Sequence, residues 1–155
     1  MVVVIDQSGS HWKLFAAISG IYIKSRRIAE SYIKPYNVTW PQFGALFQLN
    51  QKDNITQTEL ATMLEGDTNT TMVLCNSLEK KGWITREKDP NDKRVNRLLL
   101  TDQGRKVFHE VLPLMQGGYA IFAEAIPESK LQLVLPILEE LYESINQKYN
   151  EVFEK

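Results

Sequence analysis

The 155-residue sequence lacks several features on which whole classes of protein depend. Its single cysteine, Cys75, has no second cysteine in the chain to pair with, which favours a reducing compartment. A metal site needs several close ligands, and the only histidines are His11 and His109. No apolar run approaches the ~18 residues of a membrane span, and the first residues lack the basic segment of a signal peptide. These absences predict a soluble cytoplasmic protein without a metal or cofactor.

The sequence motifs of common enzymes are also missing. It has no glycine-rich phosphate loop, no Gly-x-Ser-x-Gly, no His-Glu-x-x-His and no paired cysteines at metal-binding spacing. The formal net charge of −1 gives no overall attraction to nucleic acid, although charges can be unevenly placed on the surface. We therefore expect a binding protein rather than an enzyme.

Two long segments carry apolar residues at helical spacing. The first covers residues 10–34 and should end at Pro35, because the residue before proline avoids helical geometry. The second begins near Pro127 and has a near-heptad stripe that a small monomer cannot easily cover; Pro136 should bend it or delay its start. The two stripes are Leu14, Ile18, Ile21, Ser25, Ile28 and Tyr32, and Leu131, Val134, Leu135, Leu138, Leu141, Tyr142, Ile145, Tyr149 and Val152.

Between these segments lies the pattern of a helix-turn-helix. Thr39 can cap one helix, and the spacing of Thr56 and Glu59 predicts a capping box for a second. After a turn at residues 66–67, a third helix should run from about residue 68 to 81 and stop at Gly82 in a left-handed conformation. A short helix, a glycine-containing turn and a longer helix together indicate a helix-turn-helix.

A β-hairpin should follow this motif directly. Residues 84–88 and 94–101 are predicted strands, joined by a polar turn at residues 89–93. Leu98 and Leu100 share the face that should pack, while the tip stays in water. Thr101 or Asp102 should cap a helix that reaches about residue 125. A helix-turn-helix followed by a hairpin predicts a winged helix.

Four stretches of the sequence resemble the MarR family of bacterial winged-helix regulators. They are VTWPQFGALFQL (38–49), ITQTELATML (55–64), SLEKKGWITREKDPNDKR (77–94) and LLLTDQG (98–104). The most specific match is the pattern D-x-R-x-x-x-L-x-L-T, which is filled here by Asp92, Arg94, Leu98, Leu100 and Thr101. The resemblance implies a mainly α fold with a small β-hairpin wing. It divides the chain into residues 1–36 and 104–155, which form a helical dimerisation region, and residues 37–103, the DNA-binding lobe.

The resemblance also implies what the protein does. Members of the family are homodimers whose first and last helices interleave, so that two lobes meet one palindromic operator with half-sites ~34 Å apart. The chain would then be a transcriptional regulator, most simply a repressor released by a small aromatic or phenolic ligand. The competing hypothesis is a winged-helix dimer that acts mainly by binding another regulator, with weak DNA binding of its own.

By the same resemblance, the wing tip and the third of these helices would contact DNA. Arg94 would enter the minor groove with its guanidinium oriented by Asp92, and Lys93 could reach phosphate, although a charged tip can also be merely solvated. The helix would read base edges through Thr68, Asn69, Thr70, Met72, Val73 and Asn76. The family often has basic residues at positions 73 and 77, and this chain has none there. We therefore expect weak non-specific affinity for DNA, a modest salt dependence of binding and a preference for A·T-leaning sites. The alternative for Met72 and Val73 is that both are core residues.

A ligand pocket would lie where the dimerisation and DNA-binding regions join. Its candidate residues are His11, Trp12, Tyr36, Trp40, Phe43, Phe108, Met115 and Tyr119, with Arg86 as an anion anchor. Aromatic residues at helical spacing can equally form an ordinary core. Cys75 falls where a core residue is expected, which predicts an inert buried thiol rather than a redox sensor.

Overall fold

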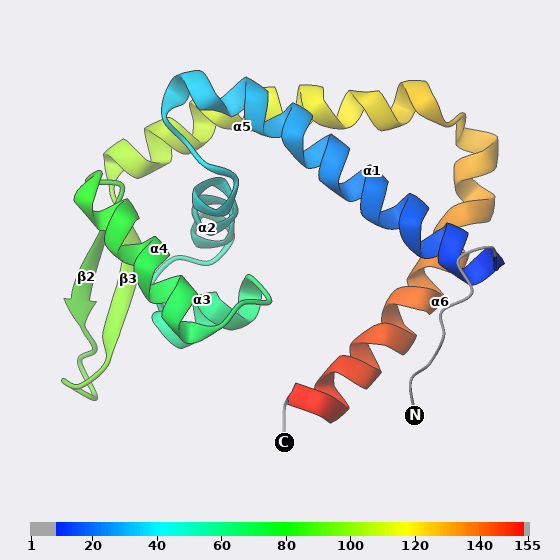
Figure 1. Cartoon of the computed structure of the whole chain (residues 1–155). Helices are drawn as coiled ribbons and strands as arrows, with labels where there is room; N and C mark the ends of the chain where they lie inside the picture. Colours follow the sequence, from blue (N-terminus) through cyan, green and yellow to red (C-terminus); the bar gives the residue numbers. More distant parts are fainter. Residues whose placement is uncertain (1–8, 154–155) are drawn as a thin grey trace. The chain divides into compact units, whose positions relative to one another are not determined.

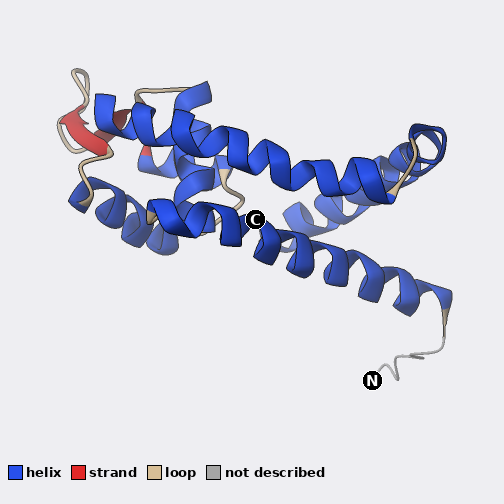
Figure 2. Ribbon diagram, turned by 90° about the horizontal axis from the view of Figure 1, so that it is seen from above, coloured by secondary structure: helices blue, strands red, loops and turns tan. Residues whose placement is uncertain are grey.

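The computed structural model describes residues 9–153, with the side chain of Tyr119 left out. Its elements in chain order are α1 (Ser10–Ile33), the 3-10 helix η1 (Lys34–Tyr36), α2 (Trp40–Gln51), β1 (Ile55–Thr56), α3 (Gln57–Met63), α4 (Thr68–Lys80), β2 (Ile84–Lys88), β3 (Asn96–Leu100), α5 (Asp102–Ala125) and α6 (Glu128–Phe153) (Figure 1). Helices dominate and the strands form one small sheet, as Figure 2 shows by colour. The predicted fold class, mainly α with a winged helix-turn-helix, is confirmed.

The chain divides into two compact units, Met1–Gly118 and Tyr119–Lys155. The first holds the winged helix together with α1 and most of α5. The second holds the end of α5 and all of α6. The functional boundaries predicted after residues 36 and 103 stay predictions.

The sheet contains three antiparallel strands in the order β1-β3-β2. In the hairpin Ile84 lies opposite Leu100, and on the other side of β3 Ile55 lies opposite Leu98. The strand β1 was not predicted, because its two residues are too few to show an alternating pattern. The strand β3 also begins at Asn96 and not at Arg94, since the wing loop takes the first two residues.

The helix boundaries follow from local hydrogen bonds that the sequence predicted. Thr39 and Gln42 form a capping box at α2, and Thr56 and Glu59 form the predicted one at α3. At the other end of the motif Gly82 has a φ of 71°, which a glycine adopts without steric cost. These signals are short-range, which is why they could be read without the tertiary structure.

The core of the first unit joins all of its larger elements. The largest fully buried side chains include Phe108, Ile33, Leu46, Leu49, Ile55, Leu60, Leu78, Leu98, Met115 and Val111. Phe43 stacks on Phe108 with ring centroids 6.1 Å apart. Gly104, in the first turn of α5, lies so close to the residue before β2 that a Cβ there would lie 2.0 Å from the carbonyl oxygen of Trp83. Only glycine therefore allows this close approach of α5 to the start of the hairpin.

The two long terminal helices carry apolar side chains that this chain leaves exposed. In α1 only Ala29 and Ile33 are buried, whereas Phe15 is 61% exposed. No residue of α6 is buried, and Ile145 is 60% exposed. The helix α6 begins at Glu128 and continues through Pro136, so the delayed start that Pro136 suggested is wrong. Among the described residues, no helix combines the length and apolarity needed to cross a membrane.

Candidate nucleic-acid interface

The helix α4 is anchored to the lobe along one face. Thr71, Cys75 and Leu78 are buried, and the Asp67 carboxylate caps the helix by accepting from the Thr70 N–H at 2.8 Å. Because these contacts fix the rotation of the helix about its axis, the opposite face is turned to solvent. Every residue predicted to read base edges lies on the exposed side: Thr68, Asn69, Thr70, Met72, Val73 and Asn76. Their contacts with bases stay predictions.

Two of these side chains are apolar and lie outside the core. Met72 is 44% exposed and Val73 is 65% exposed. The alternative interpretation of both as core residues is therefore wrong, because Thr71 and Cys75 occupy the inward positions that the helical period allows. Leu74, expected in the core, is only partly buried and packs against it.

The exposed face of α4 carries little positive charge. Val73 is exposed and Ser77 is half-buried, and neither side chain is charged. Lys81, just after the helix, is turned toward α2, where its ammonium group donates to the backbone oxygen of Asn37 and, at 2.9 Å, to Gln42 Oε1. Burial lowers the pKa of Lys81, and its Nζ lies 4.4 Å from the Trp83 ring centroid. Lys80 is thus left as the exposed cation of this helix.

Arg86 of β2 ties the hairpin to α4. Its Nη1 forms an ion pair with Glu79, and its Nη2 donates to Asn76 Oδ1 at 2.7 Å. Because arginine can only donate, this contact fixes the Asn76 amide with its oxygen toward β2. These bonds engage both terminal nitrogens of Arg86. Its expected role as the anchor of an anionic ligand stays a prediction.

The wing tip presents a single held arginine. The Arg94 side chain is 91% exposed, and the Asp92 carboxylate accepts from its Nε and Nη2, each at 3.1 Å. The same carboxylate accepts the Arg94 backbone N–H at 2.9 Å. The hydrogen bonds from Arg94 lower the pKa of Asp92, and the bond to Asp92 raises the pKa of Arg94. The contact expected between these two residues is therefore present, next to the exposed Lys93.

Residues 38–95 match the model of the MarR family. This segment contains the helix-turn-helix, β2 and the wing tip.

This segment is a MarR-family winged helix.

Individual relatives agree with this assignment. The transcriptional repressor MprA of Escherichia coli K12 is 34% identical over 83 residues, which are 52% of this chain and 47% of that repressor, so the chain spans about half the length of this curated relative. The regulator Hpr of Halalkalibacterium halodurans is 27% identical over 141 residues, covering 90% of this chain and 73% of Hpr.

Solved structures of MarR-family proteins share the fold. A mutant of Escherichia coli MarR complexed with operator DNA superposes with a TM-score of 0.78 at 25% identity, covering 83% of this chain and 93% of that one. A MarR protein from Peptoclostridium difficile superposes with a TM-score of 0.83 at 20% identity, covering 98% of this chain and 96% of that one. The arrangement of helices and wing described above is therefore that of the MarR fold.

The residues expected to line a ligand pocket differ in their burial. Phe43, Phe108 and Met115 are buried in the core, and Trp40 packs against it. Tyr36 and His11 are exposed, and Trp12 lies against Phe15 with ring centroids 5.6 Å apart. The Tyr119 side chain lies outside the described residues. Whether these residues bind a ligand is untested.

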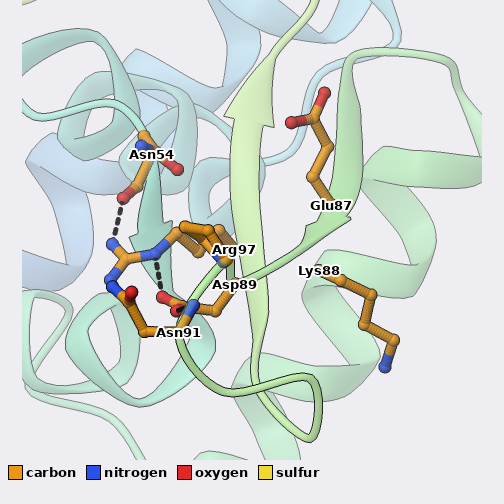
Figure 3. Close-up of a pocket in the computed structure, with 7 residues that line it drawn as sticks. Asn54, Glu87, Lys88, Asp89, Asn91 and Arg97 are labelled. Atoms are coloured by element: carbon orange, nitrogen blue, oxygen red, sulfur yellow. Dashed lines mark hydrogen bonds and ion pairs between the residues drawn. The ribbon is translucent and has the colours of Figure 1, made fainter.

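A polar pocket does lie at the root of the wing. It is lined by Asn54, Glu87, Lys88, Asp89, Pro90, Asn91 and Arg97 (Figure 3). None of the residues expected to bind a ligand belongs to it. Over the described part of the chain, no three histidine, cysteine or acidic side chains come together as metal ligands. Cys75 is fully buried, and this burial raises the pKa of its thiol, as an unreactive core cysteine requires.

Two residues of this pocket organise the wing and were missed from the sequence. Asp89 is only 5% exposed, and its carboxylate accepts hydrogen bonds from the backbone N–H groups of Asn91 and Asp92. It also forms an ion pair with Arg97. These bonds, first among them that from Asn91, lower its pKa. An available signal was the order Asp89-Pro90, because aspartate followed by proline favours the start of a turn.

Proposed function

We propose that the protein is a sequence-specific DNA-binding transcriptional regulator, most simply a repressor, that acts as a homodimer on a palindromic operator. The observation that carries the proposal is the Arg94 guanidinium, held by Asp92 at the exposed tip of a wing that follows a helix-turn-helix. An arginine held in this way has little conformational freedom left to lose on binding, and its permanent charge suits the narrow, negative minor groove.

The two DNA elements would occupy neighbouring grooves. We infer that the N-terminal half of α4 enters the major groove, where an α-helix fits and each base pair shows a distinct set of contacts. Arg94 would enter the adjacent minor groove, and Lys93 would contact phosphate. The DNA complex of the Escherichia coli MarR mutant, which shares this fold, supports the proposal.

The exposed face of α4 suggests the kind of operator. With Thr68, Asn69, Thr70, Met72, Val73 and Asn76 available and one cation, Lys80, its contacts would be methyl and amide contacts rather than charge-assisted ones. Methyl groups suit thymine, so the site would lean toward A·T pairs. Few phosphate contacts would also give weak non-specific binding and a modest salt dependence.

Dimerisation would cover the apolar faces of the terminal helices. Leu14, Ile18, Ile21 and Tyr22 of α1 are at least 39% exposed, and Tyr142, Ile145 and Tyr149 of α6 at least 49%. Apolar stripes of this length in water favour association. Two-fold pairing would place two α4 helices on half-sites ~34 Å apart.

Ligand control is the finer part of the proposal. Release from DNA by a small aromatic or phenolic molecule is the regulation that the family resemblance suggests. The ligand would act by favouring a spacing of the two lobes that misfits the operator. Its candidate residues remain those of the sequence prediction, including Trp40 and Tyr36, which are not fully enclosed by the core.

A protein-interaction regulator is the second candidate. The nearly uncharged face of α4 favours it, because such a helix gains little from the DNA backbone. In this case another regulator would be the main partner, and loss of Arg94 would leave the function intact.

Selection of genomic DNA separates the two candidates. Purified protein is mixed with fragments of its own genome at moderate salt, and the bound fragments are sequenced, with Arg94→Ala and the control Lys106→Ala in parallel. Lys106 is an exposed cation of α5, so its removal matches the charge change away from the wing. Recovery of a few palindromic sites, lost only with Arg94→Ala, supports the DNA-binding regulator. No enriched site would contradict it and favour the interaction regulator.

A further inference from the structure

The loop between β2 and β3 is held by one carboxylate at its base. Asp89 Oδ1 accepts the N–H of Asn91 at 2.7 Å and that of Asp92 at 3.1 Å. The Asp89 N–H donates to the Val95 oxygen at 3.0 Å, and the Val95 N–H donates to the Asp92 oxygen at 3.0 Å. These bonds close the wing loop on itself, and Asp89 takes part in three of the four.

The same carboxylate is anchored in the sheet. Arg97 of β3 forms an ion pair with Asp89 through Nε, and its Nη1 donates to the backbone oxygen of Asn54 at 2.8 Å (Figure 3). Asn54 directly precedes β1, the strand that pairs with β3, so Arg97 links the wing loop to the start of β1. Glu87 and Lys88 of β2 line the same pocket, and Glu87 lies opposite Arg97 in the sheet, but neither forms a hydrogen bond or ion pair with this cluster (Figure 3).

A continuous series of contacts therefore leads from the sheet to the wing tip. Arg97 holds Asp89, Asp89 holds the backbone of Asp92, and Asp92 holds the backbone and guanidinium of Arg94. Of these residues, Asp89 is buried at 5% exposed, while the Arg94 side chain is 91% exposed. A side chain so exposed has no packing of its own to limit its motion.

We propose that Asp89 is a positioning residue for DNA binding: through Asp92 it holds Arg94 in the orientation that enters the minor groove. This inference rests on the proposed function. Ordering a loop before binding removes an entropic cost that the complex would otherwise bear. Without Asp89, two backbone N–H groups and the Arg97 guanidinium lose their partner, and the tip is free to sample other conformations.

The charge of Asp89 makes the proposal easy to distinguish from simple electrostatics. A carboxylate near DNA repels phosphate, so its removal should strengthen binding if charge alone matters. Positioning predicts the opposite sign. Asp89→Asn keeps an oxygen that can accept the two N–H groups but loses the ion pair with Arg97, and Asp89→Ala loses both kinds of contact.

The first arm of the test measures affinity for the selected operator. We expect Asp89→Asn to bind about threefold to tenfold more weakly and Asp89→Ala to approach the loss seen with Arg94→Ala. Glu87→Gln is the matched control, because Glu87 carries the same charge on the same hairpin and lies opposite Arg97, but forms none of the bonds that hold the wing loop. This variant should bind as well as the wild type or slightly better. Stronger binding by Asp89→Asn would overturn the proposal.

The second arm asks whether Asp89 acts through Arg94. In a double-mutant cycle, Asp89→Asn should cost nothing in the Arg94→Ala background, because the side chain that it positions is gone. Thermal unfolding of each variant identifies a loss of folding, and Asp89→Asn replaces Asp89→Ala if the latter does not fold. An equal loss in both backgrounds would show that Asp89 acts independently of Arg94.

The third arm needs no DNA and separates this inference from the proposed function. The order parameter of the Arg94 amide in the free protein should fall from near 0.85 toward 0.6 in Asp89→Ala and stay high in Glu87→Gln. Asp89 does not touch this amide, which donates to Asp92, so a change at the amide must be transmitted through the wing loop that Asp89 holds. An unchanged value rejects the positioning role even if the operator is found. A changed value without any operator supports the positioning of Arg94 and rejects the DNA function.

Discussion

The recognition helix α4 and the wing belong to one lobe but present opposite chemistry. The helix shows solvent two apolar side chains, Met72 and Val73, among small polar ones, while its neighbour Lys81 is turned inward. The wing shows a permanently charged Arg94 with a carboxylate holding it. Under the proposed function, attraction to DNA would come from the wing and discrimination between bases from the helix. Each half of this division can be tested by changing one region to resemble the other.

Removal of the wing arginine should have the largest effect. Arg94→Ala is expected to lower operator affinity by about 10-fold to 100-fold, since the other held arginines of the winged helix, Arg86 and Arg97, are turned to α4 and to the start of β1 and cannot replace it at the tip. Arg94→Lys keeps the charge but not the fork, and it should recover only part of the loss. Equilibrium binding at fixed salt measures both, and full recovery by lysine would mean that charge alone matters at the tip.

Addition of a positive charge to α4 should remove the difference in charge between this helix and the wing. Val73→Arg is expected to strengthen non-specific binding and to steepen the salt dependence by about one unit for each protomer, because a new phosphate contact releases counterions. Val73→Gln, a longer but neutral side chain, is the control. Binding to random-sequence DNA over a range of salt measures the slope. An unchanged slope would place position 73 away from the DNA.

Removal of thymine methyl groups should have a smaller effect that tests the helix directly. Replacement of an operator thymine by deoxyuridine should cost about fourfold for each methyl that Met72 or Val73 covers, from the free energy of burying one methylene-sized group. The loss should shrink in Val73→Ala, which no longer makes the contact. Equal loss with both proteins would assign thymine readout to other residues.

Acidification should affect the wing least over the ordinary range of pH. The carboxyl pKa values of Asp89 and Asp92 are lowered by their hydrogen bonds, so the folded wing favours the charged forms. Their contribution is therefore fully present above the ordinary aspartate pKa of 3.8 and is lost only as pH falls through the lower folded values. Order parameters of the Arg94 amide from pH 7 down to about 5 should not change, and loosening within that window would contradict this prediction.

The local features of the fold could be predicted because each depends on a few neighbouring residues. The cap at Thr39, the capping box at Thr56 and the stop at Gly82 are each formed within a single turn of chain. The hairpin could be predicted because Leu98 and Leu100 alternate along the second strand and so share one face. The two-residue strand β1 could not be predicted, because only its pairing with β3 distinguishes it from a loop.

The candidate site was predicted unevenly for the same reason. The Asp92–Arg94 contact spans two residues, and the family pattern pointed to it. The contacts of Arg97 with Asp89 and with Asn54 span 8 and 43 residues, and no local pattern indicates them. The pairing of Arg86 with Asn76 and Glu79 was likewise missed, since strand and helix meet only after folding.

The sequence by itself determined the order of the α-helices and of the β2–β3 hairpin, the resemblance to the MarR family, and the nearly uncharged character of α4. These properties depend on residue type, on periodicity and on hydrogen bonds between near neighbours. The tertiary structure alone decided that Met72 and Val73 face solvent, that Lys81 turns inward, and that the buried Asp89 holds the wing tip. Such properties depend on which distant groups meet, because burial and pairing arise only when separate segments pack together.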